Sequence, residues 1–423
     1  MSAATHRAPT SSAVAAGCGT RIAPWGQYTR YMFRSYWRNS FILLAALLSI
    51  SLTTDLSALI WRLITSNPDA GFFWLSYHIA RIVLLRAIDL LALGVPISCF
   101  LAVLWTEVCH TWSRERITIW NLGRSPLQCI IPVLFFGTTM GVLQFALDTS
   151  LRPAAVMALE NRPDANHPDF TYSPTKQWIA VGNDLVHARI SAGPPPSLGE
   201  LSIYRLAADG ALLATLIAEK AIPGPTLNTW RLQNVMVRNT ALNVGRPPAS
   251  GPAPDKAGDP DQVLDEMEFV LPIDPLWLSR HGIHPQYLPH AALRALAAPT
   301  SATHSAQRYQ VWYYMRYANA FLPAGMALLA ASLSLLLIPY RIRPWAIFLI
   351  AAAGYLAHIE KKTFLVLGEY GELPPAIAAW FVPILLILIS AIIVIVPTMN
   401  FARVGRTTPR TEEHSDSANV GAG

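Results

Sequence analysis

One short charged segment, RERITIWNLGRSP from Arg114 to Pro126, lies between two long apolar runs and carries residues suited to specific recognition. Ser113 can cap the start of a helix here, and Gly123 can close its end, with the proline just beyond. The spacing predicts a helix of about nine residues, near 13 Å long at about 1.5 Å per residue. A helix this short and charged cannot itself cross a membrane.

Three residues of this helix, Glu115, Ile119 and Leu122, share one face by their i, i+4, i+7 spacing. Such a helix can lie on a lipid surface with its arginines among the headgroups. It can also insert into a groove on a partner protein. Glu115 favours the partner protein, because a carboxylate prefers a basic partner to an anionic lipid surface.

The sequence gives no support to catalysis. It contains no Gly-Lys pair and therefore no P-loop, so we expect it to bind neither ATP nor another cofactor by itself. The HExxH and GxSxG motifs are also missing. His281, His284 and His290 have a loosely metal-like spacing, but no cysteine lies near them, so we expect surface histidines and no metal site.

The composition indicates a membrane protein. Of 423 residues, 52% are hydrophobic and 14% are charged, and the mean hydropathy is +0.34, whereas soluble domains carry about 25% charge. Apolar runs of about 20 residues predict six spanning helices. They are Phe41–Ile64, Leu84–Glu107, Leu127–Leu147, Ala318–Ile338, Trp345–Leu367 and Ala376–Thr398. Asp89 interrupts the second, and HIEKK (His358–Lys362) interrupts the fifth.

Arginines predict the orientation. Residues 1–40 hold five arginines and no acid, and further arginines follow spans two, four and six. With six spans these segments share one side, so both termini should be cytoplasmic and residues 148–311 should lie outside. The net charge of +6 comes mostly from these arginine-rich segments and does not indicate nucleic-acid binding. No cysteine falls in the external segment, so we expect no disulfides there.

The external segment has the pattern of a β domain. Two hairpins are expected, one turning at Gly182-Asn183-Asp184 and one at Asp209-Gly210. In TWRLQNVMVRN, Trp230 and Leu232 lie at even positions, whereas Val235 lies at an odd position. A bulge near Gln233 would therefore bring all three onto one buried face. EMEFVLP should form a last strand. These short strands favour a sandwich or jelly roll.

The expected fold is therefore a membrane α-helical protein with a 3+3 arrangement and an inserted periplasmic all-β, jelly-roll-like domain. Its expected parts are a cytoplasmic segment 1–40, helices one to three 41–147 with the short helix 113–123, the β domain 148–311, helices four to six 312–398 and a disordered cytoplasmic tail 399–423.

Seven stretches carry a resemblance to a known family. They are VPISCFLAVLWT, RERITIWNLGRSP, WIAVGNDLVHA, LGELSIYRLAADGALLATLIAEKA, TWRLQNVMV, YYMRYANAFLP and LGEYGELPPAIAAWFVP. In this order, and nearly end to end, they resemble the LptF/LptG (YjgP/YjgQ) family of lipopolysaccharide export permeases. WIAVGNDLVHA and GEYGELPP resemble LptG more than LptF.

The resemblance implies a non-catalytic half of an ATP-binding-cassette transporter in the bacterial inner membrane. It implies an LptF–LptG pair, a separate LptB-like ATPase dimer that binds the ATP, and LptC/LptA-like bridge proteins in the periplasm. The short helix would dock on the ATPase, with Glu115 as the coupling residue and Ile119, Leu122 and Gly123 beside it. Lipopolysaccharide would enter through a lateral opening beside spans one and five and leave through the β domain.

The same resemblance suggests contacts for the lipid A phosphates. LptG-like proteins often carry lysines around the aspartate in span one, which is Asp55 here, but the chain has apolar neighbours there and only Arg62 a turn later. We expect Lys361 and Lys362 to complete a cationic rim with Arg62, and Arg316 is a further candidate. The alternative for the lysines is snorkelling to the interface.

Two other functions fit part of the pattern. One is a membrane sensor whose β domain binds a ligand, but the tail after Thr398 is about 25 polar residues long and resembles no output domain. The other is a permease half for a different lipid cargo. A co-purifying ATPase would exclude the sensor, and the identity of the bound lipid would separate the two permeases.

Overall fold

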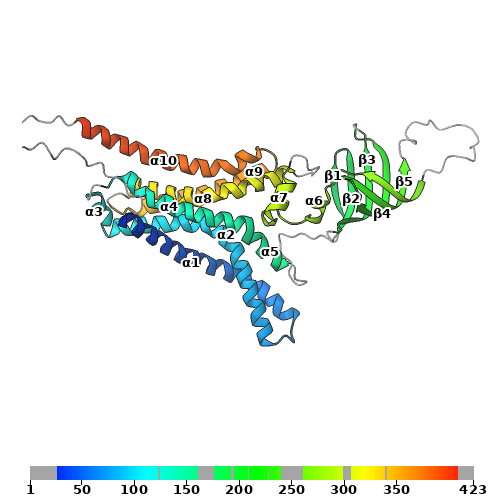
Figure 1. Cartoon of the computed structure of the whole chain (residues 1–423), viewed down its shortest axis with the longest axis horizontal. Coiled ribbons are helices and arrows are strands. Elements are labelled where there is room, and N and C mark those ends of the chain that lie inside the picture. The colour runs from blue at the N-terminus through cyan, green and yellow to red at the C-terminus, as the bar shows by residue number, and fades with distance from the viewer. Residues whose placement is uncertain are drawn as a thin grey trace, which may run out of the picture.

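A computed structural model describes residues 26–121, 124–160, 176–191, 195–207, 209–226, 228–239, 261–298, 306–338 and 341–407. Long helices form a bundle, and an antiparallel β sheet lies beyond one end of it (Figure 1). The start of α1, the end of α10 and the short helix α3 lie at the other end of the bundle (Figure 1). The sheet and these helix ends therefore lie at opposite ends of the bundle (Figure 1).

All six apolar runs are helical, and most of the helices extend well beyond the predicted limits. The long helices are α1 Gln27–Ser66, α2 Phe72–Trp112, α4 Pro126–Ala146, α8 Ala306–Leu337, α9 Pro344–Glu369 and α10 Pro375–Thr407. Within the described residues, five segments are long and apolar enough to cross a membrane. They are Gln27–Ser57, Phe72–Trp112, Gln128–Leu159, Ala306–Leu337 and Pro375–Ile395.

Helix α9 is not among these five, so the count of six spans is not confirmed. It has 26 residues and packs against α8 and α10. At about 1.5 Å per residue it is long enough for a bilayer core of about 30 Å. Its charged stretch His358–Lys362 lowers the hydropathy of the helix, as the sequence indicated.

The third helical segment continues past the predicted start of the external domain. From α4 the chain passes through a π-helical turn, Leu147–Leu151, into α5, Arg152–Glu160. Asp148 is therefore buried within helix, and the first strand begins at Gln177.

A small-residue motif brings α4 and α8 into close contact. Gly137 and Gly141 are four residues apart and face Ala324 and Ala320 of α8. A Cβ atom built on Gly141 would lie 2.1 Å from the carbonyl oxygen of Ala320, and one on Gly137 would lie 2.6 Å from the Cα of Ala324. This is the small-xxx-small packing of membrane helices. Small residues let the two backbones approach closely, and this packing stabilises helix association in lipid, where the hydrophobic effect does not contribute.

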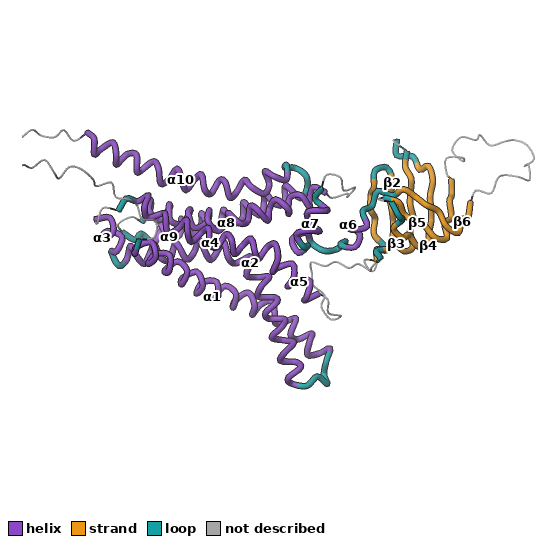
Figure 2. Tube along the Cα trace, in the orientation of Figure 1, coloured by secondary structure: helices purple, strands orange, loops and turns teal. Residues whose placement is uncertain are grey.

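The strands gather in one β domain beyond the end of the helices (Figure 2). They form one six-stranded antiparallel sheet in sequence order. The strands are β1 Gln177–Val181, β2 Asp184–Ser191, β3 Ser197–Leu206, β4 Leu212–Pro223, β5 Thr229–Asn239 and β6 Asp261–Val270. Both predicted hairpins and the all-β domain are confirmed. Every described strand pairs with its sequence neighbour, so the described strands form a meander. Among these residues no strand returns beside the first, as one would in a jelly roll.

The expected parity change in β5 is present. Trp230 and Leu232 are buried, and so is Val235, because Asn234 between them has a left-handed backbone with φ of 51°. Glu200 of β3 has φ of 48° at the corresponding level of the sheet. The local twist restores one buried face on these strands, which is the role predicted for a bulge near Gln233.

A continuous core joins the sheet to the bundle. After β6 the chain forms α6 Pro275–Ser279, η2 Pro285–Tyr287 and α7 His290–Leu296, whose apolar residues pack with the buried face of the sheet and with Tyr309 of α8. Trp230 donates its indole N–H to the carbonyl of Ile273 at 3.2 Å. The β domain is thus packed onto the start of α8.

Candidate functional site

The short helix α3, Glu115–Asn121, follows α2 after a sharp turn. Ser113 ends α2, since its N–H binds the carbonyl of Cys109 at 2.9 Å, and Arg114 has a left-handed φ of 61°. The prediction that Ser113 caps the start of the short helix was therefore wrong, because the preceding span extends further than expected. Leu122 and Gly123 lie outside the described residues.

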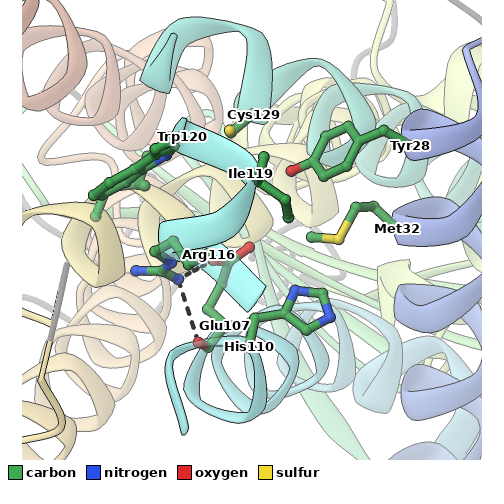
Figure 3. Close-up of a pocket in the computed structure, with 9 residues that line it drawn as sticks. Tyr28, Met32, Glu107, His110, Arg116, Ile119, Trp120 and Cys129 are labelled. Carbon is green, nitrogen blue, oxygen red and sulfur yellow. Dashed lines mark hydrogen bonds and ion pairs between the residues drawn. The ribbon is translucent and has the colours of Figure 1, made fainter. Parts of the chain in front are cut away.

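A buried ion pair fixes α3 to the bundle (Figure 3). Arg116 pairs with Glu107 of α2, and their side chains are only 5% and 9% exposed. The other Glu107 oxygen accepts a 2.6 Å hydrogen bond from Tyr36 of α1. Arg116 also donates to the carbonyls of Ser334 and Ile338 at the end of α8, at 3.3 and 3.1 Å. One guanidinium thus connects α3 to two long helices directly and to α1 through Glu107.

Glu115 has the opposite environment, because its side chain is 44% exposed. It accepts a hydrogen bond from the hydroxyl of Tyr31 at 3.2 Å, and the Nε2 atom of His110 lies 3.5 Å from it. Tyr31 and His110 stack with their ring centroids 5.8 Å apart. These contacts hold the carboxylate at the surface without neutralising it with an arginine or lysine.

An open groove of about 450 Å³ lies beside Glu115. Its lining residues come from the start of α1 and from the α2–α3 corner, and they are Gln27, Tyr28, Tyr31, Ser113, Glu115, Thr118 and Ile119. On the inner side of α3, a cavity of about 10 Å³ is lined by Ile119, Tyr28 and the buried ion pair (Figure 3), which leaves room for about one water molecule. Ile119 therefore separates a packed interior from an accessible surface.

A second polar cluster lies where the α1–α2 hairpin meets the bundle. Arg86 binds both carboxylate oxygens of Asp55 and also Asp89, the latter at 2.9 Å. Arg152 of α5 contacts the other oxygen of Asp89 at 2.7 Å. The four groups alternate in sign, so Asp55 is part of an ion-pair chain between three helices.

The other candidate lipid contacts lie in different environments. Arg316 is buried and donates to the carbonyls of Leu288 and Gln286, while its Nη1 atom has no hydrogen-bond partner within the described residues. Lys361 is half-buried and interacts electrostatically with the carboxylate of Asp148, whereas Lys362 is exposed. The two lysines therefore point to different surroundings. The side chain of Arg62 lies outside the described part of the chain.

The three histidines with metal-like spacing do not converge. His281 bonds Gln177 at 2.6 Å, His284 packs edge-on against Trp312, and His290 stacks on Tyr313. In the described part of the chain no group of three or more His, Cys, Asp or Glu side chains could hold a metal ion.

The comparison with known families decides the identity. Residues 30–396 match the model of the family described as lipopolysaccharide export system permease LptF/LptG. The chain belongs to this family. No curated protein matches the sequence. As an LptF/LptG permease it is a transporter component of the inner membrane, in agreement with its apolar helices.

Sequence patterns alone do not reveal the roles of Arg116 and Arg86, whose ion pairs join the helices of the permease. Asp89 and Glu107 were the available signals, because an acid within an apolar helix usually faces the bundle interior and has a partner. An ionisable residue within an apolar span thus indicates that a neighbouring helix carries its counter-ion.

Proposed function

We propose that this permease is the LptG-like half of an ATP-binding-cassette transporter that extracts lipopolysaccharide from the inner membrane. The observation that carries the proposal is α3. It combines an exposed acid beside an open groove with a buried ion pair to the long helices, at the end of the bundle opposite the β sheet. A surface helix that only rested on lipid would not need such an anchor.

In this proposal Glu115 and Ile119 contact a basic groove on a separate LptB-like ATPase dimer, and Leu122 and Gly123 extend the same contact. The ATPase binds and hydrolyses ATP, for which this chain carries no P-loop. A displacement of α3 is transmitted by Arg116 to α2 and α8, because the guanidinium binds groups on both. Movement at the cytoplasmic surface thereby reaches the spanning helices.

The cargo would be held toward the opposite end of the helices. Lys361 and Lys362 are the proposed contacts for the lipid A phosphates, with Arg62 on α1 completing the rim. Asp55 contributes by holding Arg86, since a carboxylate cannot itself attract a phosphate. Arg316 adds a buried positive charge beside the linker to the β domain.

The β domain would receive the lipid and pass it to an LptC/LptA-like periplasmic bridge, and an LptF-like subunit would supply the second half of the transporter. The core that runs from the sheet through α6 and α7 to Tyr309 of α8 supports a direct handover, because it holds the sheet against the end of the bundle. The sheet therefore acts as part of the permease and not as an independent module.

The proposal is tested by purifying the tagged permease from its native membrane in a mild detergent. We expect an ATPase subunit to elute with it and native mass spectrometry to find lipopolysaccharide bound. The Glu115→Ala variant should lose the ATPase and keep the lipid. An ATPase with a different bound lipid would indicate another cargo, and purification without any ATPase would favour a sensor.

A further inference from the structure

The C-terminal part of α1 and the N-terminal part of α2 form a helical hairpin that leaves the bundle sideways (Figure 1). The hairpin has its own apolar core, in which Leu56, Leu63 and Ile82 are buried together with Leu159 of α5. Arg86 and Asp55 close its base by an ion pair between the two helices. It is therefore a folded projection with a fixed attachment to the bundle.

Helix α2 is too long for all of it to lie within the bilayer core. Its 41 residues correspond to about 60 Å at about 1.5 Å per residue, twice the thickness of a bilayer core of about 30 Å. The hairpin runs at a steep angle to the bundle, and its tip lies level with α5 and α7, toward the end that carries the β sheet (Figure 1). The excess length thus extends laterally near one membrane boundary.

The tip is covered with exposed aromatic side chains. Phe72 and Phe73 are 77% and 87% exposed, and Trp61 and Tyr77 are 68% and 64% exposed. Trp74 stacks on His78 with ring centroids 3.8 Å apart.

One exposed stripe of α2 continues from the tip toward the bundle. It runs from Phe73 through Tyr77 to Arg81 and Leu84, at spacings that keep these residues on one side of the helix. The order along the stripe is aromatic, cationic, then aliphatic. This order is the one expected for a helix that enters a bilayer from its headgroup region.

We propose that the α1–α2 hairpin is an interfacial foot whose tip inserts among the phospholipid headgroups of the outer leaflet. Aromatic rings are favoured at this depth, and Arg81 can reach lipid phosphates while its stem stays in apolar surroundings. The helices that form the tip continue directly into apolar spans, so lipid already surrounds the base of the hairpin.

The shape of the tip argues against a protein occupant. A stable protein interface buries about 800 Å² on each partner and fits a complementary surface. Here the most exposed rings, Phe72 and Phe73, belong to the first turn of α2, at the tip of a two-helix hairpin that projects from the bundle. Exposure of this aromatic cluster to water is also unfavourable, because clustered exposed aromatic rings mark a membrane or binding surface. The proposal holds whatever the cargo of the permease is.

Fluorescence quenching at single positions tests this foot. The four native cysteines are replaced, and a polarity-sensitive fluorophore is attached in turn to Phe73→Cys and Leu84→Cys in the full-length protein. Leu388→Cys, exposed on α10, is the control in the hydrocarbon core, and Asp209→Cys, in a sheet turn, is the control in water. Proteoliposomes carry a spin label on the lipid headgroup or deep in the acyl chain, and iodide is the aqueous quencher.

We expect the label at Phe73 to be quenched most by the headgroup spin label, and the label at Leu84 to be quenched most by the deeper one. Quenching at Phe73 by iodide alone, as at Asp209, would place the tip in water and overturn the proposal. Deep quenching as at Leu388 would place it in the hydrocarbon core, and protection from every quencher would show a protein cover. Either result also overturns it. Phe72→Cys serves as the second tip position if Phe73→Cys does not fold.

Discussion

The guanidinium of Arg116 and the carboxylate of Glu107 form an ion pair that is shielded from water at the base of α3. Glu107 also accepts from Tyr36, and Arg116 also caps the carbonyl end of α8. Because both carboxylate oxygens of Glu107 and both Nη atoms of Arg116 have hydrogen-bond partners, much of the desolvation of the two charges is compensated. The short helix therefore moves together with the long helices to which it is bound.

Arg116→Met should strongly destabilise the permease, because it leaves the carboxylate of Glu107 buried without its counter-ion. Loss of one partner of a buried pair costs about 3–5 kcal/mol. Thermal unfolding in detergent should show a clearly lower Tm, whereas Arg114→Gln, at an exposed neighbouring position, should leave Tm unchanged. The double variant with Glu107→Gln should recover part of the loss. Equal Tm values for Arg116→Met and Arg114→Gln would refute the anchoring role.

Glu115→Gln should separate stability from transport. The side chain is 44% exposed, and its contacts with Tyr31 and His110 are worth at most about 1 kcal/mol, so Tm should hardly change. The amide keeps the hydrogen bond to Tyr31 and removes the charge, which should weaken ATPase binding and transport at least tenfold. Asn121→Ala, exposed on the same helix, is the control. Normal ATPase stimulation and transport in Glu115→Gln would show that the charge has no coupling role.

Gly141→Leu should disrupt the packing of α4 on α8. Even the first carbon of a side chain would meet the carbonyl oxygen of Ala320 at 2.1 Å, so the two backbones must move apart. We expect a lower yield of monodisperse protein and a Tm reduced by several degrees. Gly71→Leu is the matched control, since a Cβ there meets nothing within 4 Å. Similar behaviour of both variants would mean that the close approach of α4 and α8 is not required.

Lys361→Gln and Lys362→Gln should each lower the amount of bound lipopolysaccharide, and the double variant should lower it further. The effect should be partial, because an exposed ion pair is worth only about 0.2–1 kcal/mol. Lys361 should matter more, since it is half-buried near Asp148 whereas Lys362 is exposed. Quantitative mass spectrometry of co-purified lipid provides the measurement, with Arg341→Gln, at an exposed position between α8 and α9, as the control. Unchanged lipid occupancy in the double variant would favour snorkelling of both lysines.

His281 should make the stability of the β domain depend on pH. Burial lowers its pKa, and Gln177 binds its Nε2 atom. Below the ordinary value of about 6.5 the unfolded chain takes up a proton that the folded chain still resists, so stability is lost as pH falls through this window. Between about pH 7.5 and about pH 5, Tm should fall more steeply for the parent than for His281→Gln. Parallel Tm curves for the two proteins would contradict this assignment.

Much of this fold follows from sequence patterns, because membrane helices and hairpin turns have strong local signals. The apolar runs located all the long helices, and the Gly182 and Asp209-Gly210 turns located two hairpins, with positive φ at both glycines. The parity change in β5 even indicated the irregular residue to within one position. These features depend on neighbours in the chain, which a single sequence displays.

The rest depends on contacts between distant residues. Helix α1 begins well before its apolar run, and in that extension Tyr36 finds a polar partner, Glu107, on another helix. The ion pair of Asp55 and Arg86 likewise joins residues from two separate runs. The meander order of the sheet cannot be read from strand periodicity, which is the same in a meander and a jelly roll. Gly137 and Gly141 were visible in the sequence, but only the position of α8 reveals why both must be glycine.

In the proposed function, the permease moves lipopolysaccharide at the expense of ATP hydrolysis on a partner. The most direct measurement is release of lipopolysaccharide from proteoliposomes that contain the permease pair and the ATPase, to a soluble periplasmic acceptor protein that can be photocrosslinked to the lipid. We predict crosslinked lipid that accumulates with time only when ATP is present, and that is lost with Glu115→Ala. ATP hydrolysis without any transfer of lipopolysaccharide, or transfer that is equal with and without ATP, would contradict the account.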